Sequence, residues 1–133
     1  MKNGPACETK ILVIDDSQEI AEALKFWLEN EGVTVEVITE GSTGLDMIRN
    51  RQFDLILLDV AMPDFTGLDV IDSLKNEGLL ESKNIIIFTA SSDKNLFERL
   101  KNSGVKGILR KPSSLQELED LLDKYRPAKD NVA

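Results

Sequence analysis

The amino-acid sequence predicts an α/β fold in which helices cover both faces of one five-stranded, doubly wound parallel sheet. Two observations carry this prediction. Short apolar runs alternate with longer amphipathic segments along the chain, and the runs at residues 11–14, 55–58 and 85–88 are apolar at every position. A strand buried on both faces is typically a continuous apolar run, and regular alternation of strands with helices is typical of a parallel sheet.

The predicted strands follow these apolar runs. The second is the exception, because Val33, Val35 and Val37 alternate with polar residues, as expected of a strand with one buried face. The last is short and begins at a glycine. The predicted strands span residues 10–14, 33–37, 54–58, 84–89 and 107–110.

The amphipathic segments are predicted as helices because apolar residues recur every three or four positions. Asp16 and Glu19 form a capping pattern for the first helix, and Gly32 ends it. The other predicted N-caps are Ser42 or Thr43, Thr66, Ser92, and Ser113 in a capping box with Gln116. The residues expected to face the core include Ile20, Leu24, Trp27, Leu28, Leu45, Ile48, Leu68, Ile71, Leu74, Leu96, Leu100, Leu115, Leu118, Leu122 and Tyr125.

The length predicts a single domain, which we expect at residues 10–126, with a flexible N-terminal segment at 1–9 and a polar tail at 127–133. No apolar run is long enough to cross a bilayer, and the first ten residues contain no secretory signal core. Cys7 is the only cysteine, which favours a free thiol in a reducing compartment and a cytoplasmic location.

Charge and composition exclude several functions. The net charge of −8 disfavours direct binding to nucleic acid, which depends on lysine and arginine at the phosphates. The chain has no histidine. This excludes Ser-His-Asp and Cys-His catalysis, histidine metal sites and a histidine phosphocarrier within the chain.

Polar side chains follow the predicted strands at their carboxyl ends. Asp15 and Asp16 follow the first strand, Asp59 the third and Lys111 the fifth, while Thr89 ends the fourth. In a parallel sheet these ends share one edge, where ligands bind. We therefore expect the five side chains to converge.

Three neighbouring carboxylates repel one another, and a divalent cation removes that conflict. Carboxylate, carbonyl and water oxygens suit Mg²⁺, and Lys111 adds a further positive charge. The same groups serve phosphoryl transfer to an aspartate, in which a hydroxyl and backbone amides can also bind phosphate oxygens. Each residue alone has a structural explanation, as a helix cap, a strand end or a solvated lysine. The complete set, found together at the strand ends, favours a functional explanation.

These residues resemble the receiver domain of two-component response regulators, in the free-standing form typified by the chemotaxis protein CheY. The resemblance covers about residues 10–125 and implies a flavodoxin-like (βα)5 receiver fold. It rests on the motifs VIDD at 13–16, LLDVAMPDFTG at 57–67, FTA at 88–90 and KP at 111–112.

The resemblance implies a role for each matching residue. Asp59 would accept the phosphoryl group. Asp16, Asp59 and the backbone carbonyl of Ala61 would bind Mg²⁺ directly, and Asp15 would act mainly through a metal-bound water. Lys111 would bind the phosphate, and would hold a carboxylate of the metal site when phosphate is absent.

Thr89 would move toward the phosphate as the switch, and the bond between Lys111 and Pro112 is commonly cis in the family. The family usually has tyrosine or phenylalanine three residues before that lysine, where this chain has Ile108. An aliphatic side chain cannot repeat a ring movement, so either the output coupling differs or Thr89 and backbone shifts suffice. Ala61 and Ser91 are small residues beside the phosphorylation site.

The family's output face would comprise the helix from Ser92, the strand at 107–110 and the helix from Ser113. Its candidate half-exposed contact residues are Leu96, Phe97, Ile108 and Tyr125. The resemblance implies a single-domain response regulator that signals through contacts with an output protein, as a monomer or a phosphorylation-promoted dimer. A histidine kinase or phosphotransfer protein would donate the phosphoryl group, and the chain would be no enzyme beyond aiding its own phosphorylation and dephosphorylation.

Three other functions use similar residues or a similar fold. A haloacid-dehalogenase-type phosphatase needs a second acid two residues after its nucleophile, where this chain has Ala61. A flavodoxin-like flavin carrier needs a phosphate-binding loop after the first strand, where Asp15 and Asp16 would repel phosphate. A docking module with a receiver fold that signals without phosphate stays open.

Overall fold

Five strands form one parallel sheet in the spatial order β2-β1-β3-β4-β5. The structure is a computed structural model that describes residues 9–62, 66–91, 93–111 and 114–125. The strands are β1 Lys10–Ile14, β2 Thr34–Ile38, β3 Leu55–Leu58, β4 Ile85–Thr89 and β5 Gly107–Arg110. The helices are α1 Gln18–Asn30, α2 Gly41–Asn50, α3 Gly67–Asn76, the short 3₁₀ helix η2 Leu80–Ser82, α4 Lys94–Lys101 and α5 Leu115–Tyr125.

The strand order confirms the predicted doubly wound fold. The chain passes from β1 outward to β2, then returns to pair β3 with the other side of β1. The order reverses between β1 and β3, and open α/β sheets bind their ligands in the crevice beyond the strand ends at such a point. The fold therefore directs attention to the residues that follow these two strands.

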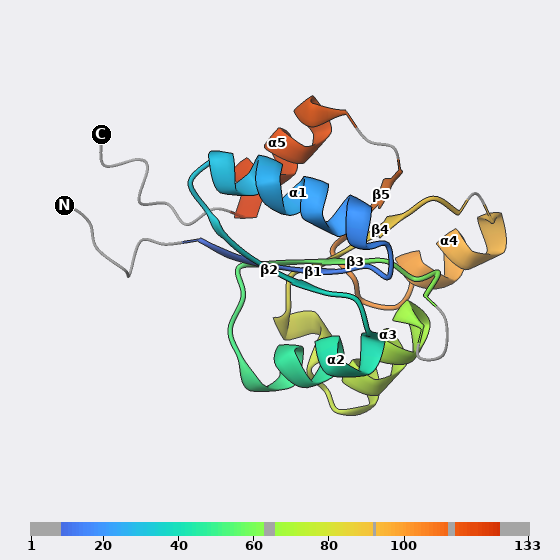
Figure 1. Ribbon diagram of the computed structural model, residues 1–133. Coiled ribbons are helices and arrows are strands. Elements are labelled where there is room, and N and C mark those ends of the chain that lie inside the picture. The colour runs from blue at the N-terminus through green and yellow to red at the C-terminus, as the bar shows by residue number, and fades with distance from the viewer. Residues whose placement is uncertain (1–8, 63–65, 92, 112–113, 126–133) are drawn as a thin grey trace.

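Alternate residues of each buried strand enter two separate cores, one on each face of the sheet. Helices α1 and α5 cover one face, and α2, α3 and α4 cover the other (Figure 1). The first core contains Ile11, Val13, Leu55, Leu57, Ile86 and Phe88 from the strands, with Leu24, Leu28, Leu118 and Leu122. The second contains Leu12, Ile14, Ile56, Leu58, Ile85 and Ile87, with Ile48, Val70, Leu74 and Leu100. Ile20 and Leu115, expected on buried faces, are exposed.

Helix α1 is capped by Ser17 and not by Asp16, so that prediction was wrong. The Ser17 hydroxyl accepts a hydrogen bond from the Ile20 amide at 3.3 Å. The prediction of Thr66 as the cap of α3 is confirmed, and Asp69 completes a capping box by accepting from the Thr66 amide at 2.9 Å. Because Asp16 is not needed as a cap, its carboxylate is free for another role.

Three other predicted caps are corrected in the same way, by one to three positions. Helix α2 begins after Glu40 without a side-chain cap, and Ser42 and Thr43 lie inside it. Asp93 caps α4 in place of Ser92, and Ser114 pairs reciprocally with Glu117 at the start of α5 in place of Ser113 with Gln116. Where several polar residues are adjacent, each is a possible N-cap. The N-cap is the residue whose backbone is still extended immediately before the helix begins.

Several sequence predictions fall outside the described residues. These are the free thiol Cys7, the side chains of Ser92 and Ser113, the bond from Lys111 to Pro112, and the tail at 127–133. Within the described ranges, no helix combines the length and apolarity required to span a membrane.

Candidate functional site

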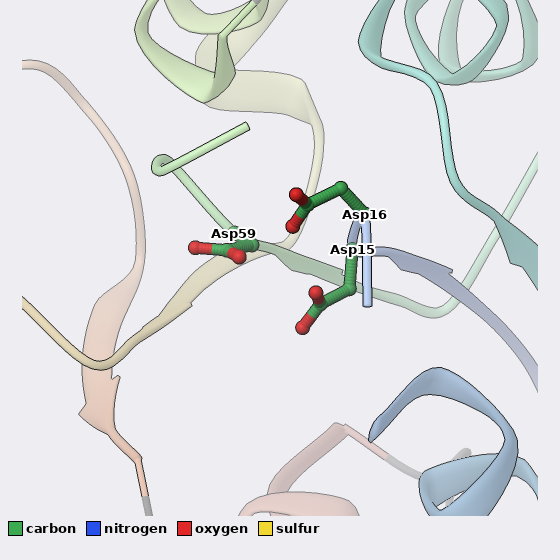
Figure 2. Close-up of side chains that lie close together, drawn as sticks. All are labelled: Asp15, Asp16 and Asp59. Carbon is green, nitrogen blue, oxygen red and sulfur yellow. The ribbon is translucent and has the colours of Figure 1, made fainter. Parts of the chain in front are cut away.

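Three aspartates meet at the carboxyl edge of the sheet, where β1 and β3 end side by side. One carboxylate oxygen from each of Asp15, Asp16 and Asp59 lies within 4.8 Å of the others. Figure 2 shows the three side chains gathered around one space beyond the strand ends. Asp15 and Asp59 are buried, whereas Asp16 is exposed. The predicted convergence of the acidic residues is therefore observed.

Backbone hydrogen bonds fix the two buried aspartates. The Asp15 amide donates to the Ile38 carbonyl at 3.0 Å, and the Asp59 amide donates to the Ile14 carbonyl at 2.9 Å. These bonds continue the sheet one residue beyond the strands. The side chains are held as well, because Asp15 Oδ1 accepts from the Ser17 amide at 2.9 Å and Asp59 Oδ1 accepts from the Ala61 amide at 3.0 Å. Each carboxylate thus presents its second oxygen to the site.

Lys111 contacts those second oxygens. Its Nζ lies 2.5 Å from Asp15 Oδ2 and 3.3 Å from Asp59 Oδ2. The Lys111 amide donates to the Thr89 carbonyl at 2.8 Å, which fixes the residue beside β4. Its ammonium also lies 5.3 Å from the centre of the Phe88 ring, a favourable cation–π distance. One largely buried lysine therefore bridges two buried carboxylates.

The remaining predicted residues lie around this cluster. Thr89 is fully buried at the end of β4, and its hydroxyl accepts a hydrogen bond from the Ser91 amide at 3.3 Å. Ala61 is exposed, and its amide is the donor to Asp59. Ile108 is half-buried in β5 opposite Ile87 and packs against the core beneath α4.

The cluster has an excess of negative charge, since three carboxylates share one lysine. Burial raises the pKa of Asp15, and hydrogen bonds from Lys111 and the Ser17 amide only partly offset that effect; the Asp59 charge adds to the rise. A hard divalent cation would relieve the excess. The donors are all oxygen, two of them preorganised and one exposed to solvent, so the residues present fit Mg²⁺.

Asp15→Asn is expected to stabilise the metal-free protein at neutral pH. Because the folded-state pKa of Asp15 is raised, its contribution to stability falls as pH rises from its ordinary value of 3.8 through the folded value. Asparagine lacks this cost and keeps an oxygen for the Ser17 amide. Urea unfolding with a chelator should show a difference at pH 7 that disappears below that ordinary pKa. An equal difference at all pH values would mean that Asp15 ionisation is not its cause.

Two residues at the site had no role in the sequence-based prediction. Phe88 lies under the Lys111 ammonium, and Gly67, the first residue of α3, lies against the backbone that carries Asp59. A Cβ on Gly67 would be 2.5 Å from the Asp59 carbonyl oxygen and 2.6 Å from Val60 Cα. The only signal in the sequence was the position of both residues inside the motifs at 57–67 and 88–90.

The chain matches a known family over most of its length. The model of the response regulator receiver domain matches residues 11–123. The chain is 33% identical over 112 residues to the response regulator ArlR of Staphylococcus haemolyticus, which covers 83% of the chain and 49% of ArlR. The chain thus spans about half the length of ArlR and of similar curated relatives.

Other matches extend over nearly the whole length of both proteins, and two examples are a curated relative and a solved structure. Sporulation initiation phosphotransferase F of Bacillus subtilis is 30% identical over 122 residues, which covers 92% of this chain and 97% of that protein. The response regulator TrrA of Thermotoga maritima, solved in complex with Mg²⁺ and BeF, is 28% identical. It has a TM-score of 0.74, and the match covers 88% of this chain and 98% of TrrA.

Proposed function

We propose, because the chain belongs to the response regulator receiver domain family, that it is a phosphorylation switch whose acceptor is Asp59. Receiver domains belong to two-component signalling, and they are signalling modules and not enzymes with a separate substrate. The observation that carries the assignment is the place of Asp59: buried at the end of β3, with Lys111 and two further carboxylates around it. Among the described residues, no aspartate outside this cluster is both buried and close to two other carboxylates.

The metal site follows from the donor set. Asp16 and Asp59, with the Ala61 carbonyl, would bind Mg²⁺ directly, and Asp15 would act through a water. Bound there, Mg²⁺ neutralises charge on the transferred phosphoryl group. The exposure of Asp16 supports its assignment as a ligand that the solvated ion can reach. The similar TrrA protein was solved in complex with Mg²⁺ and BeF, which supports Mg²⁺ as the ion.

In the proposed reaction, a carboxylate oxygen of Asp59 attacks phosphorus, and the bond from phosphorus to the donor nitrogen breaks. The product is an acyl phosphate on Asp59. The Lys111 ammonium would exchange its contact with Asp59 for a contact with a phosphoryl oxygen. The Thr89 hydroxyl and the Ala61 and Ser91 backbone amides would donate hydrogen bonds to the other phosphoryl oxygens. These groups already lie at the same edge of the sheet, so the developing charge meets donors that are held in place.

The 133 residues contain no histidine, so a donor histidine would lie outside them. We propose a histidine kinase or a phosphotransfer protein, and the similarity to Bacillus subtilis sporulation initiation phosphotransferase F supports a free-standing receiver in such a relay. Residues 10–126 would be the receiver unit, flanked by segments 1–9 and 127–133. We further propose a cytoplasmic protein, monomeric or dimerising on phosphorylation, whose output is contact with another protein. It would promote only its own phosphorylation and dephosphorylation.

The switch would work without an aromatic residue in β5. Ile108 is an aliphatic residue with no ring to reorient, and its side chain is half-buried and packed against the core. Movement of Thr89 and of the backbone at the ends of β4 and β5 would therefore carry the signal. The hydrogen bond that the Lys111 backbone amide donates to the Thr89 carbonyl joins those two ends directly.

The decisive test is the intact mass after treatment with acetyl phosphate. The protein should gain the mass of one phosphoryl group with Mg²⁺, none with a chelator, and none in Asp59→Asn. Asp54→Asn, which changes an aspartate at the opposite end of β3, is the matched control and should be modified like the wild type. If Mg²⁺ binds but no phosphoryl group is gained, the phosphate-independent docking module becomes the better interpretation.

A further inference from the structure

Lys111 would serve two anions in succession during the proposed reaction. At rest its Nζ lies 2.5 Å from Asp15 Oδ2 and 3.3 Å from Asp59 Oδ2. During phosphoryl transfer it would exchange the contact with Asp59 for one with a phosphoryl oxygen. A lysine side chain is long and flexible, and its ammonium binds without a fixed geometry. A group other than Asp59 is therefore needed to keep the ammonium in place during the exchange.

The surroundings of Lys111 leave room for its side chain to turn away. Lys111 lines a hollow of about 500 Å³ between α1 and α5. The other residues that line this hollow are aromatic or aliphatic, and none of their side chains accepts a conventional hydrogen bond. They are Ile20, Ala23, Leu24, Trp27, Phe88, Ala90, Leu115 and Leu118. Among these side chains, only the aromatic rings attract a cation.

The Phe88 ring is held firmly beside the ammonium. Lys111 Nζ lies 5.3 Å from the centre of this ring. Phe88 is 5% exposed and belongs to the core beneath α1 and α5, with Leu24 and Leu118. Its backbone lies in β4, where it pairs with Leu109 of β5. Because the ring is packed on one side and its backbone is part of the sheet, it is a fixed reference for a mobile lysine.

A ring face suits this task better than a further carboxylate would. Cation–π attraction acts within about 6 Å of the ring centre and does not require one direction of the N–H bonds. The ammonium therefore keeps its three hydrogens for Asp15, Asp59 and then the phosphoryl oxygen. The attraction is stronger where water is excluded, and the Lys111 side chain is only 11% exposed. The ring also adds no negative charge to a cluster that already has an excess.

We propose that Phe88 is a positioning residue for phosphoryl transfer, whose ring holds the Lys111 ammonium at the site while it passes from Asp59 to the phosphoryl group. The proposal rests on the proposed function and adds a requirement to it. Phe88 would touch neither the donor nor the acceptor, and would act through Lys111 alone. The rate of phosphorylation would then depend on the fraction of molecules in which Lys111 is in place.

The test changes the electrostatics of the ring and leaves its shape almost unaltered. The full chain is prepared with one, two or three fluorines on the Phe88 ring, by incorporating fluorinated phenylalanines at that codon. Each fluorine withdraws electrons from the ring face that attracts the cation. The initial rate of Asp59 phosphorylation by acetyl phosphate with Mg²⁺ is followed by intact mass. We expect the rate to fall stepwise along the series, to about one fifth with three fluorines.

The Phe53 ring provides a matched control. Arg51 lies over it, also at 5.3 Å from the ring centre. Phe53 lies before β3, at the opposite end of that strand from Asp59. Three fluorines on Phe53 should leave the phosphorylation rate within about twofold of that of the wild type. A merely structural role of Phe88 would give a flat series, because the ring volume hardly changes.

A second measurement tests the contact without phosphate or metal. Urea unfolding in a chelator is compared for the Phe88 series with Lys111 present and in Lys111→Met. Fluorination should lower stability more with Lys111 than with methionine, since a double-mutant cycle isolates the pairwise interaction. An equal effect in both backgrounds would overturn the proposal.

The rate series separates this proposal from the proposed function. Equal rates along the Phe88 series, or an equal fall with fluorinated Phe53, would reject the positioning role and leave the switch intact. No mass gain in the wild type would reject the proposed function, and the role of Phe88 with it.

Discussion

Gly67→Ala is expected to lower the free energy of unfolding by about 1–3 kcal/mol, the usual cost of overpacking a rigid site. The new Cβ would lie 2.5 Å from the Asp59 carbonyl oxygen and 2.6 Å from Val60 Cα. Both are backbone atoms, so relief requires movement of the main chain and not of a flexible side chain. The displaced residue is the proposed phosphoryl acceptor, so acetyl phosphate should also modify it more slowly.

The sign of this effect is informative because helix propensity predicts the opposite. Alanine is favoured over glycine by about 1 kcal/mol within a helix, and Gly67 begins α3. A loss of stability would therefore show that close approach to the Asp59 backbone outweighs propensity. Gly107→Ala is the control, since its Cβ meets only the end of the Ile86 side chain at 3.2 Å.

Urea unfolding of both variants, with intact mass as a second measurement, decides the matter. Gly107→Ala should stay within about 0.5 kcal/mol of the wild type, as substitutions without a specific structural cost usually do. If Gly67→Ala is as stable as the wild type and phosphorylated at the same rate, α3 does not constrain the acceptor.

The sequence was sufficient to predict that these side chains converge, because the carboxyl ends of parallel strands share one edge of the sheet. Once β1, β3 and β5 were recognised as parallel strands, Asp15, Asp59 and Lys111 had to share an edge. That inference needs only the order of the strands, and the apolar runs at 11–14, 55–58 and 85–88 clearly define β1, β3 and β4. The observed contacts of Lys111 with both aspartates follow from this geometry.

Helix starts were predicted less well, because they depend on local backbone geometry. Asp16 and Ser17 are adjacent and either could cap α1; Ser17 does so, and Asp16 extends toward the other carboxylates. The role of Gly67 was also out of reach. Its requirement arises from the distance between α3 and the backbone after β3, a tertiary quantity that no local pattern contains.

Lys111→Met is expected to destabilise the metal-free protein by about 3–5 kcal/mol, the cost of leaving buried charges without their partner. Lys111 is the lysine that bridges Asp15 and Asp59, whose side chains are only 2% and 7% exposed. Methionine retains much of the side-chain volume, so the loss of charge should dominate. Lys106→Met is the control: its ammonium binds neutral carbonyls at an exposed position, and we expect a loss below about 1 kcal/mol.

Mg²⁺ should restore much of the stability that Lys111→Met loses. This recovery would distinguish a loss of charge compensation from a loss of side-chain packing. An ion that binds only the folded protein raises the free energy of unfolding by RT ln(1 + [Mg²⁺]/Kd). The carboxylates of the variant have lost the lysine charge beside them, so Kd for Mg²⁺ should be lower than in the wild type. Thermal unfolding across a Mg²⁺ titration should therefore show a larger stabilisation in Lys111→Met than in the wild type. A packing defect would instead leave the two Mg²⁺ responses equal. In that case the lysine would fill space at the edge of the sheet, and the aspartate cluster would need another source of compensation.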